Sequence, residues 1–87
     1  MTKEEFDKLK EKLKVYLKGY KRMNGKLISN LEDLGFELIR DKKHCIFHYK
    51  VNGKIFIFEF AKTPSDQRVG IKKTFDIIST LRPEVRA

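Results

Sequence analysis

Asn52-Gly53 is the feature that most limits what this chain can fold into, because it stands between two runs of alternating apolar residues. Both residues tolerate the positive φ angles of a type I′ turn, and such a pair between apolar runs is the strongest short-range signal of a β-hairpin. A two-residue turn pairs Val51 with Lys54 and fixes the register of both strands. We therefore expect an antiparallel hairpin here.

The predicted register divides the hairpin into two faces, because successive side chains of a strand point to opposite sides. One face is an aromatic layer for helices to cover, formed by the pairs Tyr49–Phe56, Phe47–Phe58 and Cys45–Phe60. The other face carries His44–Ala61, Ile46–Glu59, His48–Ile57 and Lys50–Ile55, and alternation in the preceding strand adds Ile39. Both histidines therefore lie on the face that we expect the helices to leave open. The isoleucines of this open face are typical of a contact surface.

The N-terminal segment predicts a basic amphipathic helix. Thr2 and Glu5 have the spacing of a capping box. Apolar side chains recur at helical spacing, at Phe6, Leu9, Leu13, Tyr16, Leu17 and Tyr20. Residues 1–26 hold nine Lys and Arg against four Asp and Glu. The helix is either a solvated face that keeps the protein soluble or a basic arm that lies along a phosphate backbone.

A second helix and a strand precede the hairpin. Asn24 is the expected N-cap of this helix, and Gly35 is the expected residue after its last turn, where a positive φ is needed. Its apolar face consists of Leu27, Ile28, Leu31 and Leu34. Phe36 then begins the first strand, residues 36–41.

A loop and a last helix follow the hairpin. Thr63-Pro64-Ser65-Asp66 predicts a loop, since proline lacks a backbone donor and ends a strand. The helix has an apolar face of Ile71, Phe75, Ile78 and Leu81 and ends before Pro83. The five glycines are dispersed and are interpreted as turns and caps. The resulting order, α-α-β-β-β-α, predicts an α+β fold with the helices on one face of a three-stranded antiparallel sheet.

Length and charge limit the class of protein. Eighty-seven residues predict one domain, with the basic helix in residues 1–22 and the remaining core in residues 24–81. The net charge of +8 indicates an anionic partner, either nucleic acid or an acidic protein. The single Cys45 excludes an internal disulfide, so we expect a cytoplasmic protein with this residue as a small core side chain. No apolar stretch approaches the ~20 residues needed to span a bilayer, so no membrane partner is expected.

His44 follows Lys42-Lys43 at the start of a predicted strand. An imidazole transfers protons near neutral pH and lysines favour anions, so this group suits chemistry on a phosphodiester. His48 is a candidate second proton-transfer group, and Glu59 is a candidate partner that orients an imidazole. On the residues alone, all three are better explained as surface side chains of a sheet. The chain lacks the ligand spacing of a metal site and any glycine-rich phosphate loop, so no metal or cofactor is expected.

Three stretches, LEDLGFELIRDKKHCIFHY, NGKIFIFEF and TPSDQRVGIKKTFDII, resemble the HicA family of toxins over about residues 27–81. The resemblance lies in Leu34-Gly35-Phe36, in Arg40, in the basic turn ending in His44, in the hairpin, and in a final helix entered through a Pro-containing loop. It implies a fold like the double-stranded-RNA-binding domain. It also implies a metal-independent endoribonuclease that cleaves mRNA, a toxin held inactive by a cognate HicB-like antitoxin.

The resemblance also implies the roles of particular residues. A single histidine at the start of the second strand is catalytic in that family, which places the general acid or base on His44. We expect RNA contacts from the basic residues Arg40, Lys42, Lys43, Lys62, Lys72 and Lys73. The family usually has a glycine and a small hydroxyl residue before the histidine. This sequence has Lys42-Lys43 instead, in a turn about one residue shorter.

The sequence is also compatible with a second class of function. The same fold could be a non-catalytic module that binds RNA or an acidic protein through its lysines. The apolar open face suits docking of an antitoxin, and it equally suits a homodimer.

Overall fold

The computed structural model describes residues 1–63 and 68–86, so residues 64–66 of the expected loop lie outside the described part. The helices are α1 (Lys3–Leu17), α2 (Gly25–Asp33), α3 (Val69–Leu81) and the short 3-10 helix η1 (Arg82–Glu84). The strands are β1 (Phe36–Asp41), β2 (His44–Val51) and β3 (Lys54–Ala61). They form one antiparallel sheet in the order β1-β2-β3. The predicted α+β order is therefore confirmed.

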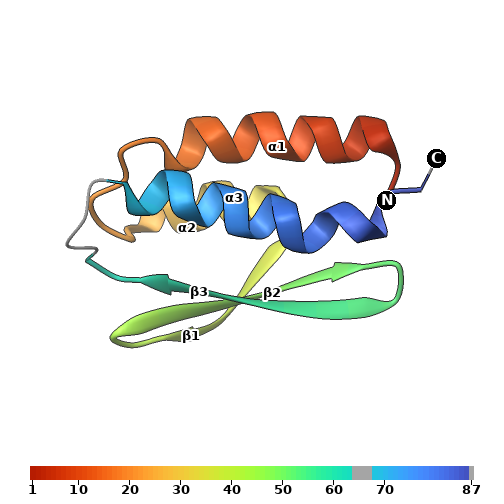
Figure 1. Cartoon of the computed structure of the whole chain (residues 1–87). Helices are drawn as coiled ribbons and strands as arrows, with labels where there is room; N and C mark the ends of the chain where they lie inside the picture. Colours follow the sequence, from red (N-terminus) through yellow and green to blue (C-terminus); the bar gives the residue numbers. More distant parts are fainter. Residues whose placement is uncertain (64–67, 87) are drawn as a thin grey trace.

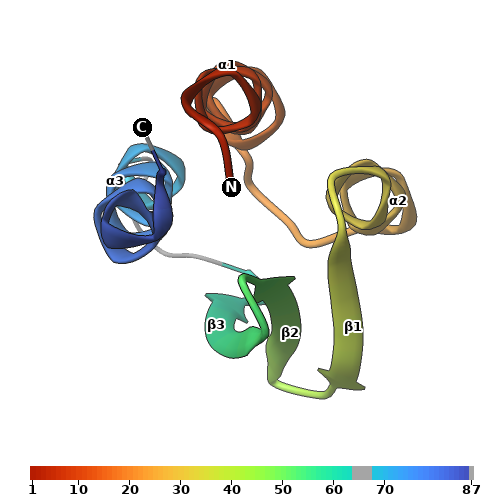
Figure 2. The same cartoon turned by 90° about the vertical axis from the view of Figure 1, so that its right-hand side faces the viewer.

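All three long helices lie on the same side of the sheet (Figures 1 and 2). In Figure 2, α2 and α3 flank the space above the strands, and α1 closes it from the top. One hydrophobic cluster fills this space, with members from α1, from the sheet and from α3, such as Leu13, Phe47 and Ile77. The N-terminal helix therefore packs into the same core as the sheet, and its lysines occupy the outer side.

The helix ends agree with the sequence signals. The Thr2 hydroxyl accepts a hydrogen bond from the Glu5 backbone N–H at 3.1 Å, and the Glu5 carboxylate accepts one from the Thr2 N–H at 3.4 Å. The Asn24 side chain accepts from the Leu27 N–H at 2.9 Å and caps α2. Gly35 has a φ of +104° after the end of α2. These contacts satisfy backbone groups that the helices leave unpaired.

The hairpin has the predicted turn and register. Asn52 and Gly53 have φ angles of 53° and 76°, as a type I′ turn requires. All the predicted cross-strand pairs are present, from Val51–Lys54 at the turn to His44–Ala61 at the far end. Cys45, Phe47 and Phe60 are fully buried on the helix side of the sheet. Both histidines therefore lie on the open face.

A β-bulge in β1 is the first departure from the sequence prediction. Leu38 pairs with Phe47, but Arg40 pairs with Ile46, so Ile39 is an extra residue in the strand. Simple alternation would have placed Ile39 opposite Ile46 and Arg40 on the helix side. The bulge instead aligns Arg40 with Ile46 on the open face. Ile39 itself is about half exposed, at 49%.

The packing of α3 is the second departure. Ile71 and Phe75 were expected on the buried face but are 54% and 66% exposed. The buried side of α3 consists of Gly70, Thr74, Ile77, Ile78 and Leu81. Gly70 was interpreted as a turn or cap, and this is wrong. It lies inside α3, where a Cβ would overlap the Leu17 carbonyl oxygen of α1. The close contact between the two helices, rather than hydrophobicity, selects the buried side.

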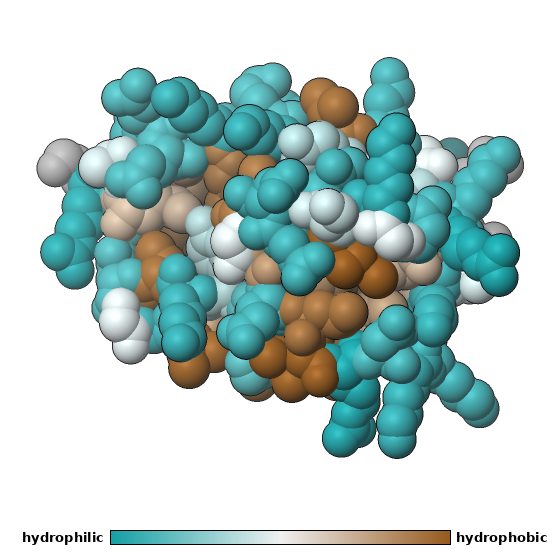
Figure 3. Space-filling view, turned by 180° about the vertical axis from the view of Figure 1, so that it is seen from behind, coloured by the Kyte–Doolittle hydropathy of each residue, from teal (hydrophilic) through white to brown (hydrophobic). Residues whose placement is uncertain are grey.

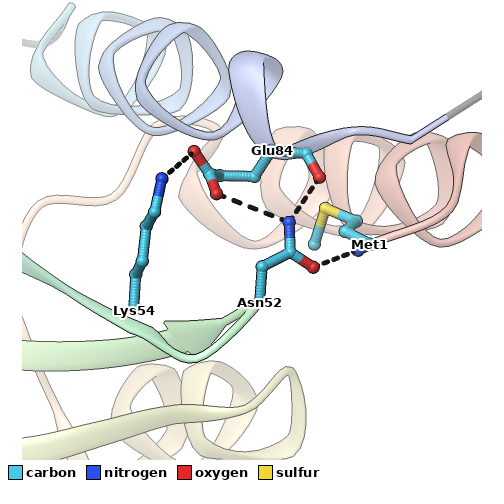
Figure 4. Close-up of polar contacts among 4 residues, drawn as sticks. All are labelled: Met1, Asn52, Lys54 and Glu84. Carbon is cyan, nitrogen blue, oxygen red and sulfur yellow. Dashed lines mark hydrogen bonds and ion pairs between the residues drawn. The ribbon is translucent and has the colours of Figure 1, made fainter.

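The two ends of the chain meet at the hairpin turn (Figure 4). The Asn52 side chain accepts a hydrogen bond from the Met1 ammonium at 2.7 Å and donates one to the Glu84 carbonyl at 2.8 Å. Lys54 pairs with the Glu84 carboxylate at 3.3 Å. The Arg86 N–H bonds to the Met1 carbonyl at 2.8 Å. These contacts hold the turn end of the sheet against α1 and η1, and leave the opposite end, which carries His44, without such a cover from the termini.

Candidate functional site

His44 is the first residue of β2 and follows directly on the tight Lys42-Lys43 turn. The turn is closed by the Asp41–Cys45 pair and by a hydrogen bond from the Lys42 N–H to the His44 carbonyl at 3.4 Å. The His44 side chain is 55% exposed. Its imidazole is therefore presented to solvent at the end of the sheet.

Glu59 lies against this imidazole. Its Oε1 is 3.1 Å from His44 Nδ1. The two residues are diagonal neighbours, because His44 pairs with Ala61 and Glu59 lies two residues earlier on β3. An ionised carboxylate only accepts hydrogen bonds, so a proton on Nδ1 would face Glu59, and a neutral imidazole would then present Nε2 as an acceptor. The sequence placed Glu59 near both histidines, and the structure brings it to His44.

Lys62 joins the same end of the sheet. Its backbone N–H bonds to the Lys43 carbonyl at 3.3 Å, which places it beside the turn. Its ammonium lies 2.7 Å from Oδ1 of Asp41. This hydrogen bond lowers the pKa of the Asp41 carboxyl and raises the pKa of the Lys62 ammonium. Part of the Lys62 charge is therefore already compensated, and Lys42 and Lys43 are the more exposed cations of the turn.

Arg22 also belongs to this basic end, although it was not among the predicted RNA-binding residues. The Met23 N–H bonds to the Lys62 carbonyl at 2.8 Å, so the loop after α1 is attached to the end of β3. The Arg22 charge is close enough to oppose protonation of Lys62. A residue 40 positions earlier in the chain gives no sequence signal of this proximity.

Arg40 reaches the open face through the bulge. It shares a cross-strand row with Ile46 and Glu59. Two strand spacings separate Arg40 from Glu59, about 10 Å. Figure 3 shows long hydrophilic side chains projecting at its lower right, where the β1–β2 turn lies, next to a hydrophobic area over the sheet. The basic turn and the apolar open face are thus adjacent.

The predicted cations of α3 lie on a different side. The Lys73 ammonium is 5.8 Å from the centre of the Phe60 ring, so Lys73 approaches the end of β3 from the helix layer. Lys72 is exposed, and it lies about 100° around the helix from Lys73. The two lysines therefore leave α3 in different directions, and neither is placed on the open face.

His48 is separated from His44. Both are on the open face of β2, but four residues apart along a strand is about 13 Å. His48 pairs with Glu37 on one side and Ile57 on the other, and it is half-buried. Two groups at that separation cannot both transfer protons at one phosphorus. The geometry groups His44 with Glu59 and leaves His48 as a cross-strand partner.

The Cys45 thiol is buried and faces the core. Burial raises its pKa, and the neighbouring Asp41 carboxylate adds to this effect. A nucleophilic cysteine needs a stabilised thiolate, so this residue is a core side chain, as the sequence indicated.

Within residues 1–63 and 68–86, no group of three or more His, Cys, Asp or Glu side chains is arranged to hold a metal ion. Among the same residues, no helix has the length and apolar character to cross a membrane.

The chain was compared with protein-family models, with curated proteins and with solved structures, and none of them matches it. The resemblance to the HicA toxins therefore stays a prediction that depends on the residues that carry it.

Proposed function

We propose that this protein is an RNA-binding endoribonuclease that cleaves mRNA without a metal ion, with His44 as the general acid and base. The observation that carries the proposal is the 3.1 Å contact between Glu59 and His44 Nδ1. In the proposal this contact favours the tautomer whose Nε2 can accept a proton, beside the exposed lysines of the turn. Orientation of a base by a carboxylate is the arrangement that general-base chemistry uses.

The proposed reaction uses the 2′-hydroxyl of RNA as the nucleophile. His44 Nε2 takes the proton of the 2′-OH as the 2′-oxygen bonds to the adjacent phosphorus. The bond from phosphorus to the 5′-oxygen breaks, and the imidazolium returns the proton to that oxygen. The products are a 2′,3′-cyclic phosphate and a 5′-hydroxyl. Lys42 and Lys43 stabilise the charge on the phosphoryl oxygens, and DNA is excluded because it lacks the 2′-OH.

The basic residues near His44 indicate where the RNA backbone would bind. Arg40 on the open face and Lys42, Lys43 and Lys62 at the turn lie at the same end of the sheet as His44. Arg22 extends this surface beyond Lys62. Contacts of this kind position phosphates without reading sequence.

The resemblance to the HicA toxins also suggests a protein partner, an antitoxin. The open face carries Ile39, Ile55 and Ile57, each about half exposed or more. We propose this face, which adjoins the turn, as the docking surface of a HicB-like antitoxin that would cover His44. A homodimer through the same isoleucines is the alternative occupant, and the cytoplasm is the proposed location because of the single reduced thiol.

One observation favours a second function. His44 and Glu59 are both more than half exposed, at 55% and 57%, so solvent weakens their interaction. A binding module needs no water-excluding site, and the same basic surface would then only hold RNA.

Cleavage and binding measured on one RNA separate the two functions. A labelled single-stranded RNA is incubated in EDTA with wild-type protein, with His44→Ala and with His48→Ala. His48→Ala is the matched control, because it removes an imidazole from the same face of the same strand. The proposal expects cleavage by wild type and His48→Ala, no cleavage by His44→Ala, and similar RNA affinity for all three. If the folded wild-type protein binds the RNA but does not cleave it, the result supports the binding module and contradicts the ribonuclease.

A further inference from the structure

A groove between α1 and α3 lies in the helix layer, away from the open face of the sheet. It has a volume of about 340 Å³ and is lined mainly by apolar surface. The exposed Ile71 and Phe75 of α3, with Ile78, form its apolar wall. Ile71 and Phe75 are the side chains that departed from the predicted burial. Large apolar side chains this exposed on one helix face are unusual unless something covers them.

Lysines form the opposite wall of the groove. Lys10 and Lys14 of α1 and Lys18, which directly follows its last residue, all line the groove together with Arg82. The lysines are spaced by four residues, which is about 6 Å per step along a helix, so they make a row about 12 Å long. None of the described carboxylates forms an ion pair with these three lysines. The Arg82 guanidinium lies 5.8 Å from the centre of the Phe6 ring.

The acidic residues of the two helices lie outside the groove. Glu4, Glu5, Asp7 and Glu11 of α1 and Asp76 of α3 are not among its lining residues. The groove therefore combines one apolar wall with one wall of uncompensated positive charge. Gly70 and Thr74, which also line it, are small and let α1 and α3 approach.

We propose that this groove binds an acidic amphipathic helix of a partner protein. An apolar stripe of such a helix would pack on Ile71 and Phe75, and carboxylates one helical turn apart would match the lysine row. This is recognition of a helix in a groove, with the charges setting its direction. A second copy of this chain is a poor occupant, since a protein of net charge +8 brings more positive charge to the lysines. Phosphates alone would leave the apolar wall uncovered.

The proposal is independent of RNA cleavage at His44, and a defined peptide tests it. The probe is a fluorescent helical peptide of about 16 residues, about 24 Å long, with a leucine stripe flanked by glutamates one turn apart. A peptide of the same composition in scrambled order, which destroys both stripes, is its control. Binding is measured by fluorescence anisotropy with the full chain at about 0.05 M and about 0.5 M salt, because exposed lysines are screened over that range.

Matched variants locate the binding site. Phe75→Glu and Lys14→Glu alter the two walls of the groove, and both side chains are exposed, so the fold is expected to persist. Val15→Glu and Lys12→Glu make the same chemical changes at exposed positions of α1 outside the groove. Circular dichroism checks that all four variants fold.

The expected result is binding of the patterned peptide that weakens about tenfold or more in each groove variant and at high salt, and is unchanged in the two controls. Equal binding of the scrambled peptide, no binding, or equal loss in all four variants would overturn the proposal. Displacement of the peptide by a short RNA, with the RNA affinity also lost in Phe75→Glu, would overturn it too and make the groove a nucleic-acid surface.

Discussion

His44 Nδ1 lies 3.1 Å from Glu59 Oε1. The two residues are on neighbouring strands but are not directly opposite each other. The hairpin register makes them diagonal neighbours, a separation that long side chains bridge. The contact therefore depends on the Asn52-Gly53 turn at the far end of the hairpin, because a slip of one residue would move Glu59 to the helix side.

Glu59 is a positioning residue in this account. Glu59→Ala should lower kcat/KM for RNA cleavage by about three- to tenfold, as expected for loss of one exposed carboxylate contact with the imidazole. Glu59→Gln should keep most of the rate, because its amide oxygen still accepts from Nδ1–H. Glu37→Ala, which removes a carboxylate opposite His48, is the control and should act as wild type. Equal rates for Glu59→Ala and Glu37→Ala would exclude the positioning role.

The basic turn should dominate the salt dependence of RNA binding. Each phosphate contact to a single strand contributes about 0.7 to the slope of log K against log salt. The double variant Lys42→Ala/Lys43→Ala should therefore reduce that slope by about 1.4, again at about 0.7 for each lysine. Lys8→Ala/Lys12→Ala, on the outer side of α1, should leave the slope unchanged. A greater reduction in the α1 variant would instead support the basic helix as the RNA-binding arm.

Asp41 should contribute to stability only above acidic pH. The Lys62 hydrogen bond lowers the Asp41 pKa from its ordinary value of 3.8, so the stabilisation is present above that value and is lost as the pH falls through the lowered pKa. The free energy of unfolding of Asp41→Asn should fall below that of wild type at pH 7, and the two should converge below about pH 4. The Lys62 pKa is raised above 10.5, so the same stabilisation is lost at the alkaline end as the pH rises through the raised value. Urea unfolding at a series of pH values measures both limits. A constant difference between the two proteins across the acid range would contradict this coupling.

Gly70→Ala should destabilise the fold by about 1–3 kcal/mol, because the added methyl group meets the Leu17 backbone and forces α1 and α3 apart. Gly25→Ala is the matched control. Gly25 also lies within a helix, at the start of α2, but a Cβ there meets nothing within 4 Å. It should leave stability unchanged or raise it slightly. Similar urea midpoints for Gly70→Ala and wild type would contradict this prediction, because they would show that α1 and α3 can move apart without a loss of stability.

The sequence determined the hairpin, its register, both helix caps and the open face that carries the histidines. These follow from local rules: a two-residue turn sets the register, and Thr2, Asn24 and Gly35 mark helix ends. The diagonal contact of His44 with Glu59 also followed from that register, although the sequence left it as one of two explanations.

Other features depend on contacts between distant segments and had no local signal. The bulge at Ile39 was hidden because Leu38 and Ile39 are both apolar, so the pattern fits two alignments. The exposure of Ile71 and Phe75 follows from the close approach at Gly70, which only the packing of α1 on α3 reveals. Arg22 reaches the basic end of the sheet through the backbone bond of Met23 to Lys62.

The most direct test of the central claim is the chemical identity of the cleaved ends. Mass spectrometry is applied to the products of one RNA, and of the same RNA with a single 2′-deoxy substitution at the cleaved position, after incubation with wild-type protein in EDTA. The account predicts a 2′,3′-cyclic phosphate and a 5′-hydroxyl from the RNA, no cut at the substituted position, and no products with His44→Ala. Products with 5′-phosphate ends, or cleavage at the 2′-deoxy position, would contradict it.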